Sequence, residues 1–163
     1  MDTIRFAVEE YIDKEFGFRF PTINIYINER NLIDLVQEIE RREDPVQPSE
    51  PLPQSYVGLH PEYYRDFARE FLGQHERGNS ILLICTCLED MCNCITGKVE
   101  INPGTVTWSD IKSPWLSSKS PSPWVDFEDA EKAGWYPVDY SALGPFTFNR
   151  RQYEDALKSL MAG

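Results

Sequence analysis

The chemistry that this sequence offers most directly is that of its cysteines. All four fall within ten residues in the spacing CxC, four residues, CxC: Cys85, Cys87, Cys92 and Cys94. If the two CxC pairs lie on neighbouring strands of a hairpin, each pair projects from one face and the turn brings the pairs together. Four thiolates at a hairpin tip form a tetrahedral ligand set for structural zinc. Residues two apart on a regular strand are separated by about 6–7 Å, so zinc requires a distorted hairpin.

Three interpretations of this cluster are open. The thiols can pack a pair of strands, since buried cysteine behaves as a small hydrophobe. All four can hold a structural zinc ion. They can also act in thiol redox chemistry, if cross-hairpin pairs come within the Cα distance of about 7 Å that a disulfide needs. Glu89 and Asp90 oppose the redox interpretation, because negative charge raises the pKa of a neighbouring thiol.

Other catalytic constellations are sparse. His60 and His75 are the only histidines, and both are expected on the surface, at the start of a helix and in a polar turn. No GxSxG, Walker A, GxGxxG, HExxH or EF-hand pattern occurs. Adjacent carboxylates such as Glu9 and Glu10 are typical of a solvated surface. We therefore predict no catalytic residue and no cofactor other than the alternative zinc, and we favour a non-enzymatic role.

The elements that must position these residues indicate an α+β protein. Residues 1–163 suit one domain, in which a mainly antiparallel sheet is packed by amphipathic helices. Apolar residues three and four apart predict helices over 3–16, 32–42, 61–72, 126–133 and 149–161. Alternating or β-branched runs predict strands over 22–28, 80–87, 94–101, 104–108 and 146–148. A proline-rich loop over 44–55 and a serine- and proline-rich loop over 112–123 interrupt the domain without dividing it.

Charge bears on the choice of partners. The chain has 27 acidic and 16 basic residues, a formal net charge of −11 and a pI near 4.6. This balance disfavours nucleic acid and anionic membranes, because both need clustered Lys and Arg. The first 50 residues carry 12 acids and 6 bases, so they hold more than half of the acidic excess. An acidic face of this kind can dock a basic protein partner.

We expect a cytoplasmic location. The N-terminus lacks the basic region of a signal peptide, and its apolar residues are separated by charges. The longest apolar run, residues 81–85, has the length of a strand and is far shorter than the ~20 residues of a membrane span. Cytoplasmic thiols are kept reduced, which fits packing or zinc binding better than structural disulfides.

A resemblance to a known family joins these segments. The stretch from Cys85 to Trp108, together with residues 23–39, 56–59 and 143–153, is similar to a family of small uncharacterised bacterial proteins. Its members carry CxC, then Gly-x-x-Gly-Cys, then a strand that ends in Val-x-Trp. The matching residues are Cys85, Cys87, Cys92, Val106 and Trp108. Leu88 and Met91 replace the two glycines. The resemblance implies a bacterial protein with one compact domain, and it brings no activity.

These observations favour a protein that works by binding. We predict a cytoplasmic factor with an acidic surface that masks a basic protein, as an inhibitor or immunity-type factor does. The alternative is a thiol-redox or structural zinc protein that uses Cys85, Cys87, Cys92 and Cys94. The oligomeric state is not predictable from these patterns.

Overall fold

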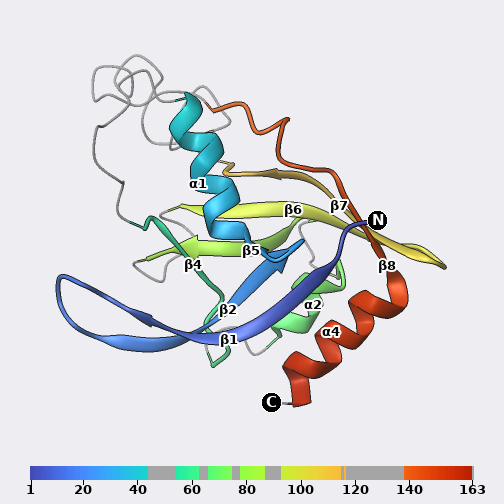
Figure 1. Cartoon of the computed structure of the whole chain (residues 1–163), viewed down its shortest axis with the longest axis horizontal. Helices are drawn as coiled ribbons and strands as arrows, with labels where there is room; N and C mark the ends of the chain where they lie inside the picture. The colour runs from blue at the N-terminus through green and yellow to red at the C-terminus, as the bar shows by residue number, and fades with distance from the viewer. Residues whose placement is uncertain are drawn as a thin grey trace.

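The computed structural model describes residues 1–43, 54–62, 66–74, 78–86, 93–114, 116 and 138–162. Strands and short helices follow one another along these ranges (Figure 1). The elements are β1 (Ile4–Ile12), β2 (Arg19–Ile27), β3 (Arg30–Asn31), α1 (Leu32–Glu43), β4 (Tyr56–Gly58), α2 (Phe67–Phe71), β5 (Ser80–Cys85), β6 (Cys94–Ile101), β7 (Thr105–Lys112), β8 (Phe146–Asn149) and α4 (Arg150–Ala162). The fold is a single α+β domain, as predicted.

Two antiparallel sheets make up the fold, and single bridges join them at both ends. One sheet has the strand order β1-β2-β3 and the other has the order β4-β5-β6-β7-β8. The Ile23 amide donates to the Leu59 carbonyl at 2.8 Å, which links β2 to the end of β4. The Asp2 amide donates to the Thr147 carbonyl at 2.9 Å, which links the start of β1 to β8. Backbone hydrogen bonds therefore follow a closed circuit around one core.

Trp108 lies at the centre of that core and is fully buried. Its indole N–H donates to the Tyr153 hydroxyl at 3.1 Å, and that hydroxyl donates to the Phe71 carbonyl. Phe148 meets the Trp108 ring edge-on, with 5.7 Å between the ring centroids. Tyr153 comes from α4 and Phe71 from α2, so the aromatic cluster fixes both helices to β7.

The predicted helix over residues 3–16 is wrong, because this segment is strand β1 and the turn that follows it. Ile4 and Val8 are one helical turn apart, but together with Phe6 they also alternate along a strand. β1 pairs with β2 over nine residues without a register shift, from Ile4 opposite Ile27 to Ile12 opposite Arg19. The buried isoleucines of β2 offer an apolar partner surface, and this pairing overrides the local helical pattern.

Most other predicted elements are present. α1 confirms the helix over 32–42, and the Asn31 side chain caps it by accepting the Ile33 amide at 2.9 Å. β2, β6 and β8 confirm the predicted strands, while β7 continues beyond Trp108 to Lys112. Asn149 caps α4 through the Gln152 amide at 3.0 Å. α2 is shorter than the predicted helix over 61–72. Residues 44–53, 87–92 and 117–137 lie outside the described ranges, so most of both loops and the helix over 126–133 remain predictions.

Candidate functional site

The hairpin of β1 and β2 extends well beyond the core (Figure 1). Its inner half is anchored by Ile23 and Ile25, which are fully buried. Its outer half, residues 8–20, forms a curved projection that we call the arm. The turn at the tip is closed by the Asp13 amide, which donates to the Phe18 carbonyl at 2.9 Å, and by the Gly17 amide, which donates to the Asp13 carbonyl at 2.8 Å. Gly17 has a φ of 73°, a conformation that glycine adopts without strain.

Large apolar side chains are exposed along the arm. Phe16 is 75% exposed, Val8 52%, Ile12 47% and Phe18 45%. The rings of Phe16 and Phe18 stack with centroids 6.4 Å apart, and Phe18 stacks on the buried Phe20 at 5.9 Å. Phe16, Phe18 and Phe20 form an aromatic row from the core to the tip. Clustered exposed apolar residues of this kind mark interaction surfaces.

His60 supports the inner end of this row. Its ring stacks on Phe20 with centroids 5.9 Å apart, and its Nδ1 accepts the Glu62 amide at 3.1 Å. The side chain is only 6% exposed, so the prediction of a surface histidine is wrong. This burial could not be predicted from the sequence. His60 is brought to Phe20 by the bridge between Ile23 and Leu59, which is a long-range contact. His75 lies outside the described residues.

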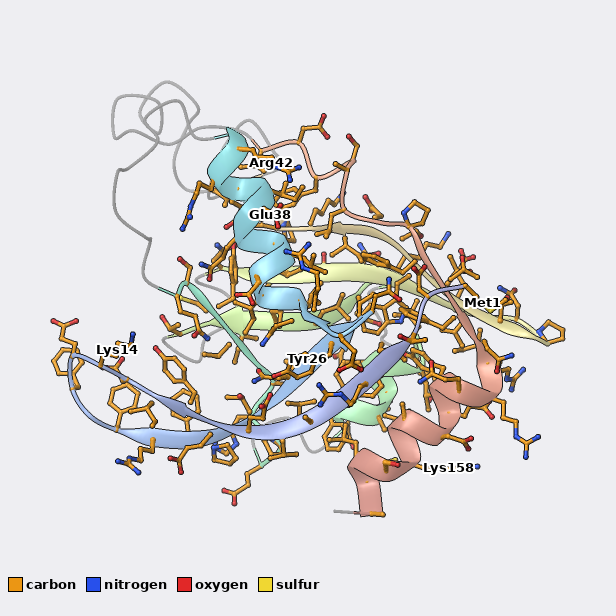
Figure 2. All side chains as sticks on the ribbon, in the orientation of Figure 1. Met1, Lys14, Tyr26, Glu38, Arg42 and Lys158 are labelled. Carbon is orange, nitrogen blue, oxygen red and sulfur yellow. The ribbon has the colours of Figure 1, made fainter. Side chains whose placement is uncertain are left out.

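A groove of about 740 Å³ separates the arm from α1. Four carboxylates line it, from Glu10, Asp13, Glu15 and Asp34. Lys14 is also part of the lining, and Figure 2 shows it at the far end of the arm. Burial and the nearby Asp13 charge raise the pKa of Tyr11, which also faces the groove. This acidic groove lies beside the aromatic row, so negative charge and apolar surface meet on one projection.

Two basic residues close to the arm, Arg5 and Arg19, already have acidic partners. Arg5 forms an ion pair with Glu29 at 3.1 Å, and its guanidinium lies 4.1 Å from the centre of the Tyr26 ring. The Tyr26 hydroxyl donates to the Glu9 carboxylate, which raises the pKa of Tyr26. Arg19 lies 3.5 Å from Glu10 in an exposed pair. Exposed ion pairs are weak. The arm also has more acidic than basic residues, so it keeps a negative charge.

The two described cysteines lie at adjoining ends of β5 and β6. Cys85 is half-buried at the end of β5, and Cys94 is buried at the start of β6. Cys94 lies directly opposite Ile84, and the Cys85 amide donates to the Asn93 carbonyl at 3.0 Å. Successive residues of a strand point to opposite faces, so Cys85 and Cys94 project from opposite faces of this strand pair. This register disfavours convergence of these two sulfur atoms.

The predicted zinc site remains a prediction, because Cys87 and Cys92 lie outside the described residues. In the part of the chain that the structure describes, no three His, Cys, Asp or Glu side chains are grouped as metal ligands. Cys85 lies opposite Tyr56 in the pairing of β4 with β5, which places it on the side of a buried polar cluster.

That buried cluster was not predicted from the sequence. One carboxylate oxygen of Glu40 accepts the Tyr56 hydroxyl at 2.5 Å and the Tyr140 hydroxyl at 2.6 Å. The Asn93 side-chain amide donates to the Tyr56 hydroxyl at 3.0 Å, and the Ser113 hydroxyl donates to Asn93 at 2.6 Å. Burial raises the pKa of Glu40, although the two tyrosines partly offset this by bonding to its charged form. The network joins α1, β4 and the segment around Tyr140, so we interpret it as structural.

The sequence contains only one weak signal for this cluster. Glu40 stands in α1 as one of several charged residues, and its partner Tyr140 is 100 positions away. The only local hint is its place on the apolar side of the helix, one residue after the buried Ile39. An acidic residue flanking a helix's apolar stripe is common at a surface and does not by itself indicate burial.

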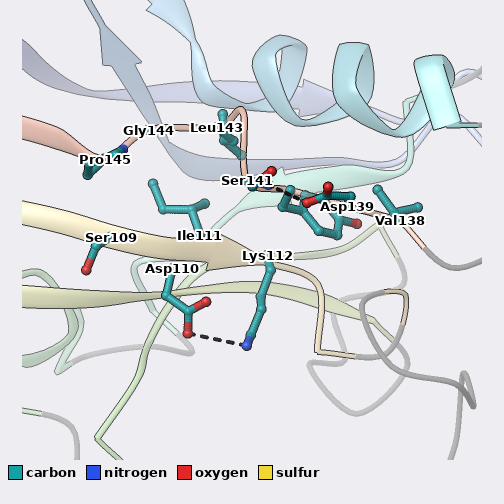
Figure 3. Close-up of a pocket in the computed structure, with 11 residues that line it drawn as sticks. Ser109, Asp110, Ile111, Lys112, Val138, Asp139, Ser141, Leu143, Gly144 and Pro145 are labelled. Carbon is teal, nitrogen blue, oxygen red and sulfur yellow. Dashed lines mark hydrogen bonds and ion pairs between the residues drawn. The ribbon is translucent and has the colours of Figure 1, made fainter.

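A second hollow, of about 360 Å³, lies beside β7 (Figure 3). Its charged side chains are already paired, since Lys112 lies 3.3 Å from Asp110 and the Ser141 amide donates to Asp139 at 2.9 Å. Tyr140 also lines this hollow, but its hydroxyl is bonded to Glu40. The hollow is therefore a weaker binding candidate than the acidic groove and the aromatic row.

No protein-family model, curated protein or solved structure matches the chain. The resemblance to the bacterial family therefore stays a prediction that rests on the motifs alone. Within the described ranges, none of the helices is long and apolar enough to cross a membrane. The function must accordingly be inferred from the geometry of the arm, the groove and the buried network.

Proposed function

We propose that this chain is a protein-binding factor that engages a basic partner through the arm. The observation that carries the proposal is the exposed end of the aromatic row, where Phe16 is 75% exposed and Phe18 is 45% exposed. Aromatic side chains dominate binding energy when a partner covers them. In the monomer these two rings gain little from burial, so their position at the tip is best explained by a partner.

The acidic groove supplies the second part of the proposal. Glu10, Asp13 and Glu15 lie on the arm, and Asp34 faces them from α1. This charge attracts a basic surface and orients it before contact, as charged patches do in association. The partner then covers the aromatic row. A role as an inhibitor or immunity-type factor, acting in the bacterial cytoplasm, belongs to the same proposal and rests on the sequence.

The test combines partner capture with a matched pair of variants. The tagged chain is incubated with native lysate at low and high salt, and a captured protein is identified, purified and titrated. Phe16→Ser is expected to weaken the measured Kd at least about tenfold, since a buried aromatic anchor contributes about 2 kcal/mol. Met161→Ser is the control, because Met161 is 61% exposed in α4 and lies outside the arm.

Two results would contradict the proposal. One is a captured partner whose affinity changes equally in Phe16→Ser and Met161→Ser, because the arm would then have no special role. The other is a partner whose affinity does not weaken as salt rises, because the acidic groove would then not contribute.

A further inference from the structure

Helix α4 packs against the inner part of β1, where Ile4 and Phe6 are buried, and the outer part from Val8 to Ile12 is largely exposed; we call this outer part the open edge. β1 is the terminal strand of the order β1-β2-β3, and the bridge at Asp2 is where it meets β8. Next along the edge, the side-chain amide of Gln152 in α4 bonds to both backbone groups of Ile4. Gln152 accepts the Ile4 amide at 3.2 Å and donates to the Ile4 carbonyl at 2.6 Å. A side-chain amide here takes the place that a neighbouring strand's backbone would have.

These bonds show which backbone groups of β1 face outward. Hydrogen bonding alternates along a strand, so the residues in phase with Ile4 present their N–H and C=O groups to the same edge. These residues are Phe6, Val8, Glu10 and Ile12. The Thr3 carbonyl is out of phase, and it accepts the Asn28 amide on the β2 side at 3.0 Å. Beyond Ile4, no described strand pairs with this edge.

The corresponding edge of β2 is closed in three ways. β3 pairs with Tyr26 and Ile27, and Leu59 accepts the Ile23 amide. Pro21 is in phase with Ile23, so this outward position has no N–H to donate. The hairpin therefore has one protected edge and one open edge.

The open edge lacks the usual protection against strand pairing. Natural edge strands are shortened, bulged, covered, or guarded by Pro or Lys. From Phe6 to Ile12 there is neither Pro nor Lys, and the pairing with β2 continues without a bulge. Val8 and Ile12 are 52% and 47% exposed on this stretch. The strand is nine residues long, which is enough to pair with an extended peptide.

We propose that the open edge of β1 accepts an extended basic segment of the partner, which adds to the sheet as a further strand. This inference rests on the proposed function and specifies how the partner docks. Backbone groups of Val8, Glu10 and Ile12 would bond to the added strand, which is the recognition mode called β-augmentation. The exposed Val8 and Ile12 would contact its apolar side chains.

Charge decides between a partner segment and a second copy of the chain. Glu10 lies on this edge, and Asp13 and Glu15 follow in the turn. Two copies paired edge to edge would bring these carboxylates together, and each chain carries a net charge of −11. A segment in which Lys or Arg alternates with β-branched residues would instead complement both the charge and the exposed valine and isoleucine.

The probe for this test is an acetylated, amidated heptapeptide of alternating lysine and valine, titrated into the full chain. Binding is followed by calorimetry and by hydrogen exchange of individual amides. Protection of the Val8 and Glu10 amides is expected to rise at least about tenfold in the complex. The same peptide with alternate amides N-methylated is expected to bind about tenfold more weakly or not at all, because it cannot donate to the edge.

Val8→Pro is the matching protein variant. It removes an outward N–H and leaves the hydrogen bonds between β1 and β2 in place. We expect it to weaken peptide binding at least about tenfold, while Val8→Ala stays within about threefold because it keeps the N–H. If Val8→Pro fails to fold, the comparison of methylated and unmethylated peptide on the unmodified chain still decides the question.

Three outcomes would overturn strand addition. They are equal binding of the methylated peptide, unchanged exchange at Val8 and Glu10, and a dimer at micromolar concentration that Val8→Pro dissociates, since the last assigns the edge to a second copy. These outcomes would not by themselves refute the proposed function, which is tested by a different variant. A cellular partner that is lost in Phe16→Ser but retained in Val8→Pro would refute strand addition and leave partner binding by the arm intact.

Discussion

Replacing Glu40 is the sharpest test of how the buried network stabilises the fold. Glu40 is 9% exposed, and one of its carboxylate oxygens accepts hydroxyls from Tyr56 and Tyr140, which are 0% and 6% exposed. Glu40→Ala leaves both hydroxyls without this acceptor in the interior. Hydrogen bonds to a charged group contribute about 1.5–3 kcal/mol each, so the gross loss is about 3–6 kcal/mol. Removing the buried charge returns part of this. We therefore expect a net loss of about 2–4 kcal/mol in the free energy of unfolding.

Glu40→Gln separates the charge from the hydrogen bonds. Gln keeps an oxygen that can accept both hydroxyls, but it does not ionise. Burial raises the pKa of Glu40 in the folded state, so ionisation opposes folding. The difference in free energy of unfolding between the wild type and Glu40→Gln therefore favours the wild type most below the unfolded-state pKa of about 4.3. As the pH rises from there to the raised pKa of the folded state, the wild type loses stability relative to the variant. The slope reaches at most about 1.4 kcal/mol per pH unit.

Urea unfolding followed by tryptophan fluorescence measures both effects, because Trp108 is buried in the folded chain. Glu38→Ala is the control in the same helix. The Glu38 carboxylate is exposed and bonds to Arg30 and Arg42, which lowers its pKa. Glu38→Ala should reduce the free energy of unfolding far less than Glu40→Ala does. Ionisation of Glu38 favours folding, in contrast to ionisation of Glu40. Our reasoning is refuted if Glu40→Ala costs less than about 1 kcal/mol at neutral pH. It is equally refuted if the stability difference between wild type and Glu40→Gln is constant from pH 4 to pH 8.

Three further predictions follow from other parts of the fold. Gly58→Ala should destabilise the chain by at least about 3 kcal/mol in urea unfolding, because its Cβ would lie 1.9 Å from the Ile23 carbonyl oxygen; a loss below about 1 kcal/mol would contradict the close approach of β4 to β2. Phe16→Ser should change the free energy of unfolding by no more than about 0.5 kcal/mol, since the ring is exposed, and a larger loss in the same assay would make the aromatic row a folding element. Elemental analysis of the purified chain should find zinc well below one ion per chain, because Cys85 and Cys94 face opposite ways; stoichiometric zinc that disappears in Cys94→Ser would establish the cysteine site.

The fold was predictable wherever one pattern dominated locally. The isoleucines of β2 alternate without competition, and α1 and α4 have both a cap and an apolar stripe. β1 failed because Ile4 and Val8 fit both periods, and only the pairing with β2 decides between them. That decision belongs to tertiary structure, since a strand gains its stability from the neighbour it meets.

The candidate site was less predictable than the fold. The acidic excess near the N-terminus pointed to a basic partner, but the error over residues 3–16 hid the hairpin that presents it. As a helix, this segment would have buried Val8; as a hairpin, it leaves Val8 and Phe16 exposed. The cysteines drew attention because of their spacing, whereas the register of β5 and β6 depends on turn residues that spacing alone does not determine.

The closed circuit of strands has a consequence for the order of folding. Gln152 is 148 positions from Ile4, and the amide and carboxylate of Asp2 bond to the backbone of Thr147. Contacts of such long sequence separation form slowly. On the ribosome, the N-terminal hairpin emerges early but must wait for β8 and α4 before its first strand is held. Through that interval the arm and the open edge are both accessible, so the proposed partner would meet the proposed binding surface before the domain is complete.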